Sequence, residues 1–407
     1  MEQDLTREEP LVERELTGKE PLMNREFTRQ EPLMNREFTR QDTQVVKGLA
    51  VLCLLLYHLF ENYDRVISMN VVYKPLPLEL FLMLTGFGNI CVAVFAFLSA
   101  YGITKSLMKN NGRKMAGQAG KETGCDSSGW KEYYSGAVLR YIRLTANFLI
   151  MFLSVNLLWF KKFDYKGLYG GGWQGLLYGL LDAFGLAGLF KTPTINETWW
   201  YMELAVMIIF FVPVLHVVAK KMGNYVILIA VLVPAAVDLS FDFKRYYFVI
   251  LLGVLAAERG WLEKLYAWKL PKILQALVGL LLFAGCIVIR QNYVVYHEFA
   301  YLLDGPIALF FTWFAGEILG AVRGVRQVLA LFGRHSMNIY FVHTFFYLAI
   351  YQQFIYSFSY AGLIFLVLAG ISLLYSLVLQ GLKKLCRFDK GMERLNVKWQ
   401  DMLRRQL

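Results

Sequence analysis

Long apolar runs recur from residue 44 to residue 382, separated by short polar and charged segments. A run of about 20 apolar residues has the length of a helix that crosses the hydrocarbon core of a bilayer. Because lipid offers no hydrogen-bond partner to the backbone, such runs fold as helices, and we predict an all-α, polytopic transmembrane helix bundle. Nine runs are clear candidates for spans: 44–60, 81–104, 140–160, 198–219, 224–240, 271–289, 299–320, 336–356 and 360–382.

Two shorter apolar segments, 175–190 and 246–257, leave the number of spans open by length alone. The positive-inside rule favours 246–257, because the loops richest in Lys and Arg then all fall on the side of the basic N-terminal segment. We therefore predict about ten spans in the cell (cytoplasmic) membrane, with both termini cytoplasmic. Segment 161–197 becomes an external re-entrant or surface-lying stretch, which we expect to line the site.

The first 42 residues differ from the rest in containing a repeat with a period of 11: "LTREEPLVERE", "LTGKEPLMNRE" and "FTRQEPLMNRE". Each copy carries a proline, which breaks a continuous helix. We predict a disordered cytoplasmic tail over 1–42, a membrane domain over 43–384 and a basic cytoplasmic tail over 385–407 that contacts membrane lipid. A partner-binding role for the repeats stays open.

Composition supports the membrane assignment and excludes several other classes. Hydrophobic residues make up 57% of the chain and charged residues 18%, against about 25% charged residues in soluble domains. The net charge of +11 comes largely from basic residues beside the spans, so we expect membrane topology and not nucleic-acid binding to explain it. There is no CxxC pair and no metal-ligand cluster, and we expect no metal and no tightly bound cofactor.

The stretch "KGLAVLCLLLYHLF" places a titratable ring inside the first apolar run. His58 lies eleven residues after Lys47, about 16 Å further along a helix at 1.5 Å per residue. Ionisable residues within spans are costly and are therefore candidates for function. A neutral imidazole can accept a proton from a hydroxyl group. The alternative is an interfacial histidine at the end of a helix.

Two further groups of polar residues lie in or beside predicted spans. Arg140 and Arg143 have i, i+3 spacing and share a helix face, where guanidinium groups would bind phosphate or simply anchor the span. In "FGRHSMNIYFVHTFF", Ser336 and His343 lie two helical turns apart on one face, with Asn338 between them. These side chains either line a site or form hydrogen bonds between helices.

These segments together resemble the membrane-bound acyltransferase-3 family, typified by bacterial O-acetyltransferases of surface polysaccharides. The family's opening R-G-L-A…H motif corresponds to Lys47-Gly48-Leu49-Ala50…His58, with Lys in place of Arg, and its R-x-x-R to Arg140 and Arg143. Three further segments match in order, "VFAFLSAYGITKSL", "TWWYMELAVMIIFFVP" and "GRHSMNIYFVH". Where many members carry acidic residues after the tryptophan, this chain has Ala205 and Val206, with Glu203 one turn earlier.

The resemblance implies transfer of an acyl group, acetyl by analogy, from cytoplasmic acyl-CoA to a hydroxyl of a cell-surface glycan or similar acceptor. It assigns His58 as general base and Lys47, Arg140 and Arg143 as the binding groups for the acyl-CoA donor. Ser336, Asn338, His343 and Glu203 are then expected to line the site. The acceptor, the acyl group and the oligomeric state are not readable from the sequence.

A different class of function, an exporter of an envelope precursor, is the alternative. Transporters often show internal repeats with paired broken helices, and the two halves of 44–382 show no such self-similarity. Release of CoA distinguishes the two hypotheses, because a transporter releases none.

Overall fold

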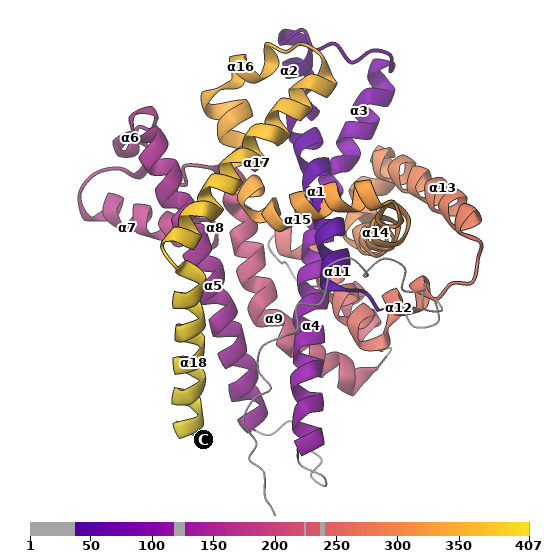
Figure 1. Cartoon of the computed structure of the whole chain (residues 1–407), viewed down its shortest axis with the longest axis vertical. Helices are drawn as coiled ribbons and strands as arrows, with labels where there is room; N and C mark the ends of the chain where they lie inside the picture. Colours follow the sequence, from indigo (N-terminus) through magenta and orange to yellow (C-terminus); the bar gives the residue numbers. More distant parts are fainter. Residues whose placement is uncertain (1–36, 118–126, 224, 237–240, 407) are drawn as a thin grey trace, which may run out of the picture.

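The computed structural model describes residues 37–117, 127–223, 225–236 and 241–406. The N-terminal repeats, and with them almost all of the predicted tail 1–42, lie outside these described residues. Helices dominate the described part, and its only β contact is an isolated bridge between Val72 and Tyr360. The predicted all-α bundle is confirmed, and Figure 1 shows its long helices packed side by side.

The described helices follow one another in this order: α1 (Arg40–Phe60), α2 (Tyr63–Ser68), α3 (Leu78–Gly86), α4 (Cys91–Gly117), α5 (Ser127–Trp159), α6 (Tyr165–Tyr169), α7 (Gly172–Ala183), α8 (Ala187–Phe190), α9 (Tyr201–Met222), α10 (Tyr225–Ala236), α11 (Phe241–Arg259), α12 (Trp261–Tyr266), α13 (Lys272–Gln291), α14 (Tyr293–Trp313), α15 (Arg323–Thr344), α16 (Gln352–Tyr356), α17 (Ala361–Leu385) and α18 (Phe388–Gln406). Figure 1 places α2 and α16 at one end and the C-terminus of α18 at the other.

Among the described residues, seven helical segments are long and apolar enough to cross a membrane: Arg40–Phe60, Leu78–Lys109, Tyr133–Lys162, Glu197–Met222, Lys272–Gln291, Phe299–Ala321 and Ala361–Leu385. They correspond to seven of the predicted spans, so the protein is a multi-pass membrane protein. The other three predicted spans fall on α10, α11 and α15, which do not combine sufficient length and apolar composition. The number ten therefore stays a prediction.

The boundary predicted for the span 336–356 is wrong, because α15 begins at Arg323 and ends at Thr344. A π-helical segment, Phe345–Ile350, follows it directly. The first turns of α15 carry Arg323 and Arg326, which made them look like a loop in the sequence. They are helical because this part of α15 packs along α1, where Arg326 donates to the Asp42 carboxylate at 2.8 Å.

Among the described residues, helices α1 and α15 make the most extensive helix–helix contact, and they run in the same direction. Asp42 pairs with Arg326 near their starts, and the rings of His58 and His343 are in contact near their ends. Glycine permits the close approach between these points: a Cβ on Gly48 would lie 1.8 Å from the Leu329 carbonyl oxygen, and one on Gly333 would lie 1.8 Å from the Gln44 carbonyl oxygen. Small residues at such crossings let two helix backbones touch in membrane bundles.

The segment 161–197 contains only short helices, α6, α7 and α8, and α7 ends at a bend where Gly185 has a φ of +69°. Twelve residues are too few to span a bilayer, so 175–190 forms no continuous span. Hydrogen bonds tie the end of this segment to α15, from Asn196 to Thr344 (2.7 Å) and from the Trp199 indole to the Phe341 carbonyl (2.9 Å). The segment therefore reaches the end of α15 that bears His343.

The predicted basic tail 385–407 contains the helix α18, which begins just after α17 ends. Arg387, between them, has a φ of +52°, in the left-handed region. Lys383, in the last turn of α17, is buried and donates to the Asn147 side chain of α5 at 2.8 Å. That hydrogen bond fixes the end of α17 against α5.

Candidate active site

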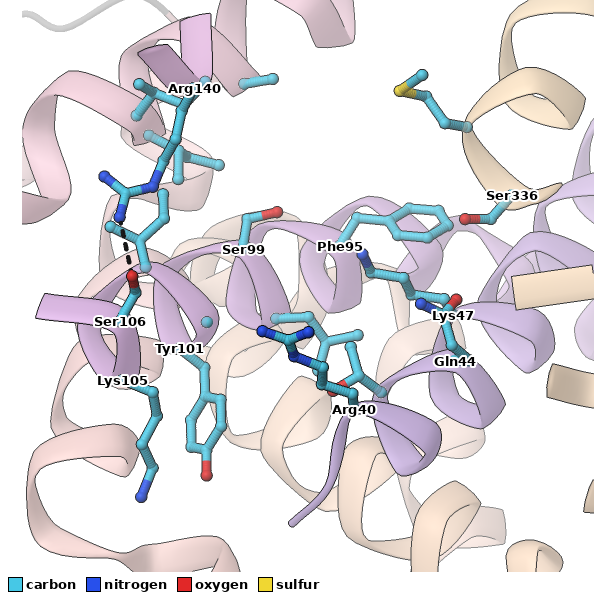
Figure 2. A pocket seen from close by; sticks show the side chains of 18 of the residues that line it. Arg40, Gln44, Lys47, Phe95, Ser99, Tyr101, Lys105, Ser106, Arg140 and Ser336 are labelled. Atoms are coloured by element: carbon cyan, nitrogen blue, oxygen red, sulfur yellow. Dashed lines mark hydrogen bonds between the residues drawn. The ribbon is translucent and has the colours of Figure 1, made fainter. Parts of the chain in front are cut away.

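A cavity of about 1030 Å³ lies between α1, α4, α5, α9, α12 and α15. It is large enough for a sizeable small-molecule ligand, for which pockets of about 300–1,000 Å³ are usual. The residues of its wall come from helices far apart in the sequence, and Figure 2 shows ten of them labelled. The polar residues of the wall include Glu37, Arg40, Lys47, Tyr101, Lys105, Ser106, Lys109, Arg140, Glu263, Ser336 and Tyr340.

Among the described residues, five cationic side chains and two carboxylates line this cavity. The cations are Arg40, Lys47, Lys105, Lys109 and Arg140, and the carboxylates are Glu37 and Glu263. Helical spacing explains the clustering, because Arg40 and Lys47 are two turns apart on one face of α1 and Lys105 and Lys109 one turn apart on α4. The cavity thus carries an excess of positive charge.

One of the two carboxylates is occupied by protein partners. The Glu263 carboxylate accepts from Lys105 Nζ at 2.7 Å and from the Tyr101 hydroxyl at 3.0 Å. Burial alone would raise the pKa of Glu263, but the hydrogen bond from Lys105 outweighs it and holds the pKa below its ordinary value. Glu263 therefore offsets Lys105, and the other cations remain available to an anionic ligand.

Arg140 and Lys47 are the cations set deepest in the wall. Arg140 Nη2 donates to Ser106 Oγ at 3.2 Å, whereas Arg140 Nη1 is buried with no hydrogen-bond partner among the described residues. For the Lys47 ammonium, the described part of the chain offers no hydrogen bond or ion pair. Buried polar groups are nearly always paired, and an anion that entered the cavity could pair with both groups.

The structure separates the two arginines that the sequence placed together. Arg143 lies one turn beyond Arg140 on α5, but its side chain is exposed and does not line the cavity. The exposed position is the one expected of an anchor beside a span. Arg140 and Lys47 line the same cavity, and Arg143 does not.

The residues predicted on α15, which are Ser336, Asn338 and His343, lie in three different places. Ser336 lines the cavity, together with Tyr340 and Phe341. Asn338 instead faces α17, where its Nδ2 donates to Ser376 Oγ at 2.9 Å. This contact is the interhelical hydrogen bond that the sequence left open as the alternative for Asn338.

Glu203 does not line the cavity either. Its side chain lies against α8, where a Cβ on Gly188 would come within 3.0 Å of a carboxylate oxygen. Ala205, half a turn further along α9, does line the cavity. The position at which many family members were expected to carry an acid therefore faces the cavity as a methyl group.

His58 lies outside the cavity, towards the other end of α1. Its side chain is 17% exposed, and its Nδ1 lies 3.4 Å from a carboxylate oxygen of Glu61, one turn further on. Because a carboxylate only accepts, this contact places the proton on Nδ1 and leaves the Nε2 lone pair open. A neutral ring in that tautomer can accept a proton from a hydroxyl at Nε2.

His343 lies against His58, with the ring centroids 5.1 Å apart. It is fully buried, and its Nδ1 donates to the Tyr340 carbonyl at 2.7 Å. The same reasoning leaves Nε2 as an acceptor, and Nε2 has no hydrogen-bond partner among the described residues. The two histidines that the sequence treated separately thus form one pair.

Further contacts hold the end of α1 that carries His58. Arg65 donates to the His58 carbonyl at 2.8 Å, and its guanidinium lies over the Tyr347 ring, 5.3 Å from the centroid. The Tyr356 hydroxyl donates to the Leu59 carbonyl at 2.7 Å. These bonds satisfy carbonyls that the end of a helix leaves free and so fix the position of the ring.

Sequence reasoning missed several residues of this site, although signals for them were present. Tyr101, Lys105 and Ser106 all lie in the segment "VFAFLSAYGITKSL" that carried part of the family resemblance. Glu61 stands at i+3 from His58, a spacing that brings two side chains of a helix together. The partners Glu263 and Tyr340 come from distant helices, and no local pattern shows them.

A family model described as an acyltransferase domain, of the acyltransferase-3 type, matches residues 42–380. No curated protein and no solved structure matches the chain. The family match covers both histidines of the pair and the cavity residues from Thr43 onward.

Proposed function

From its membership in this acyltransferase family, we propose that the chain transfers an acyl group from cytoplasmic acyl-CoA to a hydroxyl acceptor on the outer side of the membrane. Acetyl is the acyl group we propose, and a cell-surface glycan or similar envelope molecule is the acceptor. His58 acts as the general base. The observation that carries this proposal is the placing of a basic cavity and a histidine pair along the same two helices, α1 and α15.

The cavity suits the donor because acyl-CoA joins an anionic, phosphate-bearing head to a long, thin arm that ends in the thioester. Arg140 and Lys47 would hold phosphate oxygens, for which cationic donors are the usual partners. The arm would then extend past Ser336 and Tyr340. His58 lies about 16 Å beyond Lys47 at the rise of an α-helix, in the same direction.

The reaction needs one base and one leaving group. His58 Nε2 removes the proton from the acceptor hydroxyl, whose oxygen attacks the thioester carbonyl carbon. The new ester C–O bond forms as the C–S bond breaks, and the CoA thiolate leaves. Glu61 stabilises the imidazolium through Nδ1–H, as a carboxylate does for a histidine base in general.

Topology agrees with this direction of transfer. Basic residues gather beside the cavity at the start of α1 and along α4, and the positive-inside rule supports a cytoplasmic position for this side. The end of segment 161–197 meets the end of α15 that bears His343, since Asn196 donates to Thr344 at 2.7 Å. This segment would line the approach of the acceptor.

The experiment uses the full chain in proteoliposomes with labelled acetyl-CoA and extracts of envelope material as acceptor. We expect CoA release in the wild type and a fall of at least about 10³-fold in His58→Gln, in the range of general-base catalysis. His335→Gln is the matched control, because His335 lies on α15 but faces Ser376 of α17. If acetyl-CoA neither bound nor reacted, the exporter hypothesis would replace this one.

A further inference from the structure

The cations that α1 supplies to the cavity lie at two levels along the helix. Lys47 is half-buried, whereas Arg40, two turns nearer the start of the helix, is exposed. At the rise of an α-helix the two residues are about 10 Å apart along the axis. A ligand that follows α1 into the cavity therefore meets Arg40 first and Lys47 second.

The chain that enters α1 is held against the cavity wall, and this fixes the position of Arg40. Thr39 caps the helix: its Oγ1 accepts from the Asp42 N–H at 3.1 Å, and its own N–H donates to the Asp42 carboxylate at 2.9 Å. The Phe38 ring packs edge-on against Tyr101 of α4, with the ring centroids 5.5 Å apart. These residues begin the fourth copy of the 11-residue repeat, "FTRQ", so the end of the repeat region forms part of the cavity.

The neighbouring carboxylates leave the charge of Arg40 available to a ligand. Asp42 accepts from Arg326 of α15 at 2.8 Å, and Glu263 is bonded to its partners on α4. Glu37 lies at the same cavity. Within the part of the chain that the structure describes, neither Glu37 nor any other residue forms an ion pair or hydrogen bond with the Arg40 side chain. A phosphate group that reached the start of α1 would therefore meet an uncompensated guanidinium.

Coenzyme A carries phosphate at two places that differ in their distance from the thioester. A diphosphate ends the pantetheine arm, and a monophosphate is attached to the ribose 3′-oxygen, further from the sulfur. With the thioester at His58, an extended arm reaches back along α1 for a length comparable to the distance of about 16 Å between His58 and Lys47. The diphosphate then lies at Lys47, and the ribose lies further out, at the level of Arg40.

We propose that Arg40 binds the 3′-phosphate of the donor and thereby selects thioesters of CoA over thioesters whose carrier lacks that phosphate, such as dephospho-CoA or protein-bound pantetheine. The guanidinium fork suits a terminal phosphate, which offers several oxygens to two parallel N–H groups. In Figure 2 the Arg40 side chain extends from the start of α1 into the cavity. The inference rests on the proposed function and names the class of donor carrier that the site accepts.

The test measures binding and needs no acceptor. Calorimetric titration of the full chain in detergent micelles compares CoA with dephospho-CoA, which differs only in lacking the 3′-phosphate. Arg40→Gln removes the charge at the outer level, and Lys47→Gln is the matched control, because the diphosphate assigned to Lys47 is present in both ligands. An ionic strength of about 0.15 M screens attraction between exposed charges more than about 8 Å apart.

We expect the wild type to bind CoA about 10-fold more tightly than dephospho-CoA, at the lower end for a contact to a charged group, because Arg40 is exposed. Arg40→Gln should lose this preference by weakening the binding of CoA alone. Lys47→Gln should weaken the binding of both ligands and keep the preference. Arg40→Lys, which keeps the charge without the fork, should show an intermediate preference, and the exposed Arg143→Gln should bind as the wild type does.

The ratio of the two affinities is measured within each variant, so partial unfolding, which weakens both ligands alike, does not change it. Equal binding of CoA and dephospho-CoA by the wild type would overturn the role of Arg40 while the acyltransferase proposal stands. The full wild-type preference in Arg40→Gln or in Arg40→Lys would do the same. Wild-type protein that bound neither ligand would instead remove the acyltransferase proposal itself, and the role of Arg40 with it.

Discussion

The two ends of α1 contrast in charge and in exposure. At its start, Arg40 and Lys47 face a cavity that is rich in cations and lined by residues of six helices, α1, α4, α5, α9, α12 and α15. At its end, the histidine pair is packed among aromatic rings, with His343 fully buried and His58 17% exposed. Cationic groups therefore gather at one end of the helix and aromatic groups at the other.

The contrast teaches that one helix places charged and aromatic groups at different points along its length. Charged side chains are expected near the aqueous side, since an unpaired ion deep in lipid is costly. A neutral imidazole ring carries no such cost, and two of these rings lie together at the far end of α1. Helices α1 and α15 both contribute to the cavity and to the histidine pair, and so they hold the two at a fixed separation.

The largest effect is expected from a substitution that separates α1 from α15. Gly48→Ala or Gly333→Ala would bring a methyl group to 1.8 Å from a carbonyl oxygen of the other helix. We expect a loss of more than about 3 kcal/mol of stability and of both CoA binding and turnover, because overpacking of backbone cannot relax by a rotamer change. Thermal unfolding in detergent micelles measures the effect.

Gly370→Ala is the control for that experiment, since a Cβ on Gly370 of α17 would meet no neighbouring atom within 4 Å. It should leave unfolding unchanged or slightly delayed, because alanine is the better helix former. Equal unfolding temperatures for Gly48→Ala and Gly370→Ala would contradict the close packing of α1 on α15.

A smaller change would disable the cavity and leave the histidine pair intact. Lys47→Ala and Arg140→Ala should each weaken acyl-CoA binding about 10- to 100-fold, because each removes a charge-assisted contact worth about 1.5–3 kcal/mol. Arg143→Ala is the matched control, one turn along α5 and exposed. Calorimetric titration with CoA gives the affinities, and a loss in Arg143→Ala equal to that in Arg140→Ala would contradict the cavity as the donor site.

The smallest predicted effect concerns Glu61, at the end of α1 that carries His58. Glu61→Gln keeps the size of the side chain but removes the charge 3.4 Å from His58 Nδ1. We expect kcat to fall about 10-fold with little change in KM, since the carboxylate stabilises only the protonated ring, within the range of acid–base effects.

Glu79→Gln, at an exposed position on α3, is the control for Glu61→Gln. A rise in KM without a change in kcat would place Glu61 in acceptor binding and not in support of the base. The rate should be followed with acceptor saturating, so that the two parameters separate.

Much of this arrangement was predictable from the sequence. Apolar runs gave the bundle, and the spacing from Lys47 to His58 gave a cation and a base at different heights on one helix. The start of α15 was not predictable, because Arg323 and Arg326 look like loop residues until α1 supplies Asp42 as a partner. Tertiary contact there overrode local composition.

The pairing of the histidines escaped the sequence for a similar reason. His58 and His343 belong to helices far apart in the chain, and no periodicity connects them. Arg140 and Arg143 had indistinguishable neighbourhoods in sequence, yet only one faces the cavity, because three residues of a helix turn a side chain by less than a full circle. Choosing between them required the position of α5 against its neighbours.

The contact between Asp42 and Arg326 joins residues 284 positions apart in the chain. During synthesis α1 is made first, and its closest partner emerges only when most of the protein has already entered the membrane. Contacts of such large sequence separation form late, since the intervening chain must be ordered before they add stability. The part of the cavity wall that Ser336 and Tyr340 supply and the contact between His343 and His58 therefore form together, once α15 has been made.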